Sequence, residues 1–276
     1  MSYKKILTIQ DISCVGQCSL TVALPILSAC GMETCILPSA VLSTHTAGFS
    51  GFTFRDLTDD MPDIQKHWQK ENIRFSAIYT GYLGSTKQID YVKDILQTMG
   101  TEDCVRVVDP AMADNGNLYP AFDMAYVEAM KVLCGAADIL IPNITESCFL
   151  ADVPYQETYD ENYIRGLLEK LAALGAKTIV LTGVSYTPGK TGVVVYENGE
   201  MAYYQHDKIS KGCHGTGDVY ASAFVGALMN DKTVQESAKI AADYTVKCIE
   251  NTQGDSDHWY GAKFETALRD LIDMVQ

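Results

Sequence analysis

The chain has 276 residues, of which 47% are hydrophobic, and a formal net charge of −14 at pH 7. A chain of this length and composition can bury a large core, and it fits one α/β domain at least as well as two small domains. The negative charge argues against nucleic acid or an anionic membrane as a partner, because neither would be attracted. An anionic substrate would need local help from backbone amides and a metal ion.

The start of the chain, its apolar runs and its cysteines indicate where in the cell the protein works. Residues 1–5 lead directly into a short apolar strand, and no apolar run reaches the length of a membrane span. The nine cysteines are scattered and form no Cys-x-x-Cys pair. We therefore expect no signal peptide and no membrane segment, and we expect reduced thiols in a cytoplasmic protein.

Strands and helices are predicted to alternate along most of the chain. Residues 6–9 have the character of a buried strand, and residues 19–30 have that of the helix behind it. The segment 43–54 has neither period, and its small residues interleaved with aromatics favour a mobile flap over a pocket, with an edge hairpin as the alternative. The other predicted elements are strands at 34–37, 75–80, 105–109, 138–141 and 178–181, a hairpin of 193–196 with 201–204, and helices at 63–70, 86–99, 123–134, 160–174, from 217, 234–251 and 262–274.

This alternation is typical of a mainly parallel sheet with helices on both faces. The hairpin is marked by Asn198 and Gly199, a pair that favours a tight turn. The chain shows no repeat, low-complexity tract or linker, so we predict a single α/β domain over residues 1–276 with a small flap around 43–54. In such a sheet, ligands bind beyond the carboxyl ends of the strands.

A glycine-rich turn stands before one of the last predicted helices. Gly215 and Gly217 flank Thr216, and Asp218 follows where a run of small residues begins. Glycines allow a tight turn that a ligand can approach, and the first amides of a helix have no intrahelical partner. This arrangement attracts phosphate, and a carboxylate beside it suits a base that deprotonates an attacking hydroxyl. The alternative is an ordinary helix start with a favourable acid.

Polar residues also gather where several predicted strands end. Any one such cluster could be a turn or a helix cap, and Asn143 could simply cap a helix that contains Glu146. Several clusters at the same edge of one sheet, together with Asp218, instead describe an acidic pocket beside an anion site, which suits a magnesium–nucleotide complex. The residues concerned are Asp109 and Asp114, Asn143 and Glu146, Thr182 and Gly183, and the run 80–85.

Two common nucleotide-binding signatures are absent from the sequence. Residues 183–191 look like a P-loop, but they have one residue too many between the glycines and lead into a strand, where a P-loop opens a helix. Residues 10–20 contain only one glycine, Gly16, so the dinucleotide-binding fingerprint is missing as well. A nucleotide would therefore bind by another route.

Taken in order, these motifs resemble the ribokinase-like superfamily of small-molecule kinases, and within it the pyridoxal (pyridoxine, pyridoxamine) kinases. The Ser-x-His-Thr segment at 43–46 and the Gly-Tyr-Leu-Gly-Ser segment at 81–85 are the ones that favour vitamin B6 over other substrates of the superfamily. The matching segments span nearly the whole chain and are 9–10, 41–46, 80–85, 108–114, 142–146 and 215–218.

The resemblance implies roles for the glycine-rich turn. Asp218 would deprotonate the 5′-hydroxymethyl group of the vitamer. The amides of Gly215, Thr216 and Gly217 would hold the phosphoryl group as it is transferred from ATP.

The resemblance also implies a nucleotide and metal site. Asp109 and Glu146 would be ligands of Mg²⁺, partly through water, and K⁺ is a further candidate cation. The residues implied in binding ATP are Asp114, Asn143, Glu146, Thr182 and Gly183.

On the substrate side, the resemblance implies that Ser39, His45 and Tyr82 line the pyridine ring, with the 43–54 segment as a lid. Asp11 stands where relatives usually place a hydroxyl residue that faces this ring. A carboxylate there would favour a positively charged vitamer, or it could turn aside and bond the backbone amides of residues 13–16.

The sequence therefore predicts ATP-dependent, Mg²⁺-requiring phosphorylation of pyridoxal, pyridoxine or pyridoxamine. A hydroxymethylpyrimidine kinase of thiamin synthesis is the nearest alternative, because it shares the fold and the chemistry. A catalytically idle B6-binding protein is the alternative from another class, and the intact Asp218 argues against it. A homodimer is expected from the resemblance alone.

Overall fold

In the computed structural model, which describes residues 3–209 and 213–276, a nine-stranded sheet has the order β11-β10-β9-β8-β5-β4-β1-β2-β3. Its central strands are parallel, and antiparallel strands flank them at both edges. The parallel strands are β1 (Lys5–Ser13), β2 (Glu33–Leu42), β4 (Phe75–Thr80), β5 (Gly100–Val108), β8 (Ile139–Leu140) and β9 (Thr178–Val184). The antiparallel ones are β3 (Phe54–Asp56), β10 (Lys190–Glu197) and β11 (Glu200–Asp207).

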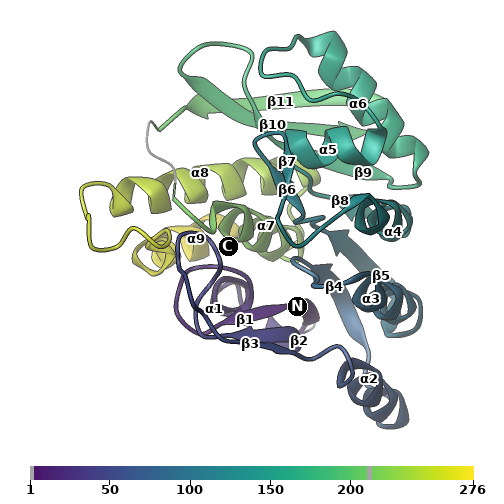
Figure 1. The fold of residues 1–276 in the computed structure, drawn as a ribbon. Helices are drawn as coiled ribbons and strands as arrows, with labels where there is room; N and C mark the ends of the chain where they lie inside the picture. The colour runs from purple at the N-terminus through teal and green to yellow at the C-terminus, as the bar shows by residue number, and fades with distance from the viewer. Residues whose placement is uncertain (1–2, 210–212) are drawn as a thin grey trace.

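Helices cover both faces of the sheet, and each face has its own hydrophobic core (Figure 1). One core includes residues of α2 (Met61–Lys70), α3 (Thr86–Thr98), α4 (Met124–Cys134), α5 (Ile144–Ala151) and α6 (Glu161–Ala173). The other includes residues of α1 (Leu20–Ala29), α7 (Thr216–Leu228), α8 (Val234–Thr252) and α9 (Leu268–Val275). This arrangement confirms the predicted α/β fold.

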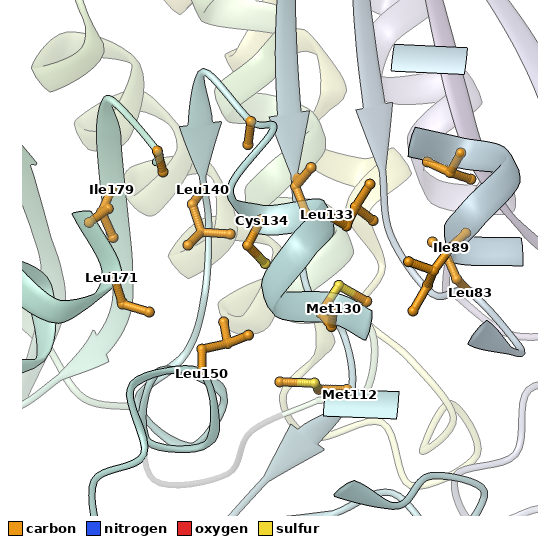
Figure 2. Close-up of a cluster of buried hydrophobic side chains, with 14 of the residues drawn as sticks. Leu83, Ile89, Met112, Met130, Leu133, Cys134, Leu140, Leu150, Leu171 and Ile179 are labelled. Atoms are coloured by element: carbon orange, nitrogen blue, oxygen red, sulfur yellow. The ribbon is translucent and has the colours of Figure 1, made fainter. Parts of the chain in front are cut away.

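The strands of the parallel region are apolar on both sides because helices bury both faces. Leu140 of β8 lies opposite Ile179 of β9 in the sheet, and both belong to the core on the α2–α6 face. Figure 2 shows the same core, with Leu171 of α6, Leu150 of α5 and Met130 of α4 packed over these strands. Because these strands are parallel, their carboxyl ends lie at one edge of the sheet, where the polar side chains meet.

Several boundaries differ from the prediction. Strand β1 does not end near Ile9 but continues to Ser13, with a register shift against β2 between Gln10 and Ile12. The predicted last helix divides into a 3-10 turn, Phe264–Ala267, and α9. A small ribbon of β6 (Ala113–Asp114) with β7 (Asn117–Leu118) was not predicted.

The segment 43–54, which we call the flap segment, joins β2 to β3. These strands pair antiparallel, and Ser43 N donates to Thr53 O at 3.2 Å. The segment therefore closes an edge hairpin with a long loop, and its role as a mobile flap stays a prediction.

Two general predictions bear on the chain as a whole. None of the helices in the described part of the chain has the length and apolar character needed to cross a membrane. Residues 1 and 2, which belong to the segment predicted to lead directly into the first strand, lie outside the described residues.

Candidate active site

The predicted polar residues gather at the carboxyl ends of the parallel strands, next to the start of α7. Asp109 follows β5 and Glu146 lies in the first turn of α5, while Asp218 lies in the first turn of α7. The charges of Glu146 and Asp218 both act on Asp109. Three carboxyl groups far apart in sequence are thus neighbours at one edge of the sheet.

The turn before α7 needs glycine for a steric reason. Gly215 has a φ of 75°, in the left-handed region, and a Cβ there would lie 1.6 Å from the carbonyl oxygen of Gln17. A Cβ on Gly217 would meet no atom of the described residues within 4 Å. The turn therefore packs against the loop after β1 on one side and leaves open space for a ligand beside the first turn of the helix.

Asp218 is held by the backbone of the same loop. Its Oδ2 accepts a hydrogen bond from Ser19 N at 2.9 Å. Burial raises the pKa of Asp218 to about 7, the amide of Ser19 opposes this increase, and the negative charge of Asp11 adds to it. A carboxyl group with a pKa near neutrality can take up a proton from a substrate at physiological pH.

Glu146 is held by a capping box at the start of α5. Asn143 Oδ1 accepts from Glu146 N at 2.9 Å, and Glu146 Oε2 accepts from Asn143 N at 2.8 Å. Its other oxygen accepts from Met112 N at 3.2 Å. The suggested cap of a helix by Asn143 is therefore present, and the cap also places the Glu146 carboxyl group in the acidic cluster.

Burial governs the protonation of this cluster. It raises the pKa of Glu146 to about 7, against the hydrogen bonds from the backbone. Burial and the neighbouring charges of Glu146 and Asp218 raise the pKa of Asp109 well above its usual range. A cation nearby would relieve this repulsion.

The donor atoms fit a magnesium ion that is held mainly by phosphates and water. Among the described residues, no group of three or more His, Cys, Asp or Glu side chains could hold a metal ion. Mg²⁺ usually takes only one or two carboxylates and fills its shell with waters and substrate phosphates. Asp109 uses Oδ1 to accept from Ala111 N at 3.2 Å. Asp109 and Glu146 together supply the one or two carboxylates that Mg²⁺ usually takes.

The other predicted nucleotide residues lie around the same edge. Thr182 donates to Pro142 O from its amide at 2.9 Å and from its hydroxyl at 3.3 Å. Gly183 is exposed with a φ of 76°, and within the described part of the chain a Cβ there would meet nothing within 4 Å. Asp114 is exposed on β6, and its charge acts on Glu146.

The four predicted substrate residues also come together. Ser39 Oγ donates to Tyr82 O at 3.4 Å, and the charge of Asp11 acts on both Tyr82 and His45. Asp11 lies inside β1, buried to 5% exposure, and accepts from Ser13 Oγ at 3.0 Å. Burial raises its pKa, and the hydroxyls of Ser19 and Ser13 oppose this.

Sequence reasoning missed two sets of residues near the site. One is the aromatic run that continues from Tyr82, where the ring of Phe122 lies 5.4 Å from Tyr82 and 3.8 Å from Tyr126, centroid to centroid. The other is the pair Trp259 and Tyr260, which contacts the flap segment. Two adjacent aromatics in a polar loop were the available signal for this pair.

Comparison with known proteins places the chain among small-molecule kinases. A protein of Bacteroides thetaiotaomicron, solved as a candidate phosphomethylpyrimidine kinase in a crystal form with pyridoxal, is 37% identical, with a TM-score of 0.93 over 98% of this chain and 96% of that one. Pyridoxal kinase from Lactobacillus plantarum is 30% identical, with a TM-score of 0.92 over 99% of this chain and 98% of that one.

The hydroxymethylpyrimidine/phosphomethylpyrimidine kinase of Bacillus subtilis is 23% identical over 219 residues, which cover 78% of each chain. Residues 24–261 match the phosphomethylpyrimidine kinase family. The resemblance to ribokinase-like kinases of B6 vitamers is thus confirmed at the level of the family, as is a phosphotransferase that acts on an alcohol group. The chain belongs to the phosphomethylpyrimidine kinase family.

Proposed function

We propose that this protein phosphorylates the 5′-hydroxymethyl group of a B6 vitamer, with ATP as the phosphoryl donor. The observation that carries the proposal is Asp218, a carboxyl group with a pKa raised to about 7 that stands beside an open glycine turn at the start of α7. Its substrate class is supported by the 37% identical relative with pyridoxal and by the 30% identical pyridoxal kinase.

In this proposal the chain supplies a base and an anion site. Asp218 accepts the proton of the attacking hydroxyl, and its bond from Ser19 N holds the carboxyl group in place. The amides of Gly215, Thr216 and Gly217 stabilise the charge of the phosphoryl group in transfer, because they stand at the positive end of α7. A positioned base is worth roughly 10²- to 10⁴-fold in rate.

Asp109 and Glu146 would hold Mg²⁺ beside the nucleotide, and Asn143, Thr182, Gly183 and Asp114 would surround its phosphates. When bound, the ion neutralises charge on the phosphates. Backbone amides hold the Glu146 carboxyl group through both oxygens, so we propose that it acts through water. A role for K⁺ stays a prediction.

On the other side of Asp218, the vitamer ring would lie among Asp11, Ser39, Tyr82 and His45. The flap segment follows directly on β2, so we propose that it covers this ring. A covered site keeps water from the transferring phosphoryl group.

The decisive experiment compares four alcohols with ATP: pyridoxal, pyridoxine, pyridoxamine and 4-amino-5-hydroxymethyl-2-methylpyrimidine. We expect the highest kcat/KM for one of the three vitamers. A higher value for the pyrimidine would favour the second candidate, a hydroxymethylpyrimidine kinase, to which the family name and the Bacillus subtilis relative point. Binding of vitamers without consumption of ATP would indicate an idle binding protein.

We also propose that the protein is a cytoplasmic homodimer. The resemblance to pyridoxal kinases supports the dimer, and the scattered cysteines support a reducing compartment. Sedimentation equilibrium would give about twice the 30.3 kDa of one chain if the dimer forms.

A further inference from the structure

The flap segment contacts a loop that is more than 200 residues away in the sequence. This loop, residues 253–263, lies between α8 and the 3-10 turn, in the yellow part of the chain in Figure 1. His45 Nε2 lies 2.6 Å from Tyr260 O. The ring of Phe49 lies 4.7 Å from that of Trp259 and 6.1 Å from that of Tyr260, centroid to centroid.

The hydrogen bonds of His45 fix where its proton lies. Ala47 N donates to His45 Nδ1 at 3.2 Å, so Nδ1 is the acceptor nitrogen of the ring. The proton of the neutral imidazole is therefore on Nε2, which donates to Tyr260 O. Both ring nitrogens are bonded to the backbone, and in this arrangement neither one is left to bond a substrate.

Two glycines let these rings lie against the backbone. A Cβ on Gly16 would lie 2.2 Å from Cδ2 of His45, and a Cβ on Gly48 would lie 2.7 Å from Cζ3 of Trp259. Both glycines have positive φ, 116° and 86°. Any larger residue at either position would displace the ring that it faces, so the contact depends on side chains and backbone together.

The 253–263 loop is tied to α8 and is suited to be the fixed side of the contact. Lys263 N donates to Thr252 Oγ1 at 2.8 Å, and Asp255 Oδ1 accepts from His258 N at 3.2 Å. The ammonium group of Lys263 also pairs with Asp255. Trp259 itself remains 44% exposed, so its ring contributes little to the core and instead lies against the flap segment.

We propose that Trp259 and the carbonyl of Tyr260 are positioning elements of the vitamer site, which hold the flap segment closed through Phe49 and His45. His45 then links two loops. Its ring forms part of the wall of the vitamer site, while its nitrogens bond the backbone and not the substrate. The inference rests on the proposed function for the identity of the substrate, while the contact between the two loops can be tested without any substrate.

The test combines hydrogen–deuterium exchange of the ligand-free protein with steady-state kinetics on pyridoxal. Trp259→Ala should speed exchange of amides in residues 43–53 by about tenfold, because local opening becomes easier. The KM for pyridoxal should rise about three- to tenfold, which corresponds to the free energy that one aromatic pair contributes. The kcat should change less than about twofold. His45→Phe keeps a ring but removes the Nε2 donor, and it should speed the same exchange.

The controls separate the flap segment from general effects. Trp259→Phe should restore most of the protection, and Tyr3→Ala, which removes an aromatic residue 74% exposed at the other end of β1, should change neither readout. Unchanged exchange in both Trp259→Ala and His45→Phe would overturn the inference, even with a raised KM. Faster exchange in a protein that phosphorylates no vitamer would uphold the contact and reject the proposed function.

Discussion

The two halves of the site are built in different ways. On the phosphate side, backbone amides next to strand and helix ends hold the carboxyl groups, namely Ser19 N for Asp218 and Met112 N and Asn143 N for Glu146. On the vitamer side, loops hold one another, as His45 does with Tyr260. The proposed phosphate side is thus built on the ends of strands and helices, while the proposed vitamer side combines strand residues, Asp11 of β1 and Ser39 of β2, with a contact between two loops.

The halves also differ in electrostatics. The phosphate side gathers buried acids, and burial raises the pKa of Asp109, Glu146 and Asp218. On the vitamer side, His45 has a pKa lowered by burial, so the ring is kept neutral beside Asp11. Three buried acids therefore gather where a cation and a phosphate would compensate their charge, while the described part of the vitamer side has one buried acid, Asp11.

The largest effect should come from removing the base. Asp218→Ala should lower kcat roughly 10²-fold or more, while the affinity for ATP and the fold change little. The isosteric Asp218→Asn keeps an acceptor for Ser19 N but cannot take the proton, so it should lose similar activity. Near wild-type turnover in either variant, measured by a coupled ATPase assay, would remove Asp218 from the role.

Glu146 tests whether the acidic cluster is more than a helix cap. Glu146→Ala should raise the Mg²⁺ concentration for half-maximal rate by about tenfold, since one of two carboxylates is lost. It should also cost about 1–2 kcal/mol of stability.

The matched control lies on α8, where Thr233 and Glu236 form the same capping box. Glu236→Ala should lower stability slightly and leave the Mg²⁺ requirement unchanged. Equal Mg²⁺ requirements in the Glu146 and Glu236 variants would show that the cluster is structural.

Asp11 tests recognition on the vitamer side. If its carboxylate attracts a cationic vitamer, Asp11→Ser should lower kcat/KM for pyridoxamine relative to pyridoxal by about 5- to 10-fold. Ser13→Ala removes the hydroxyl bonded to Asp11 and keeps the charge, so the ratio should hold. Parallel losses on both vitamers, with lower stability, would mean that Asp11 only supports the fold of β1.

The smallest effect concerns the pH dependence of stability without Mg²⁺. Asp218 and Glu146 have pKa values of about 7 in the folded protein, above the ordinary values of 3.8 and 4.5. The folded protein therefore retains protons that the unfolded chain releases, so these groups favour folding at acid pH and this contribution is lost as pH rises through 7.

Between about pH 5.5 and 8, the free energy of unfolding should fall by roughly 1 kcal/mol or more from these groups. Urea titrations should show a smaller fall in the Asp218→Asn, Glu146→Gln double variant. Asp207→Asn is the control, because an ion pair with Lys190 lowers the pKa of that exposed carboxyl group, out of this pH range. An undiminished fall in the double variant would contradict the assignment.

Features that depend on neighbours along the chain could be predicted from the sequence. The helix predicted at 160–174 is α6, which begins after Asp160, whose side chain accepts from Tyr163 N at 2.9 Å. The hairpin around Asn198 and Gly199 is likewise present as β10 and β11. Caps and tight turns are local interactions, so a short stretch of sequence contains the information for them.

Tertiary structure decided the rest, for reasons of packing and burial. Polar Gln10 and Asp11 end the apolar run of β1 in the sequence, yet the strand continues because it pairs with β2 up to Ser13. The bond from Ser19 to Asp218 and the contact of Phe49 with Trp259 join segments about 200 residues apart. The sequence by itself determined the fold class and the acids of the site; which backbone amides hold those acids, and which loop holds the flap segment, follow only from the folded chain.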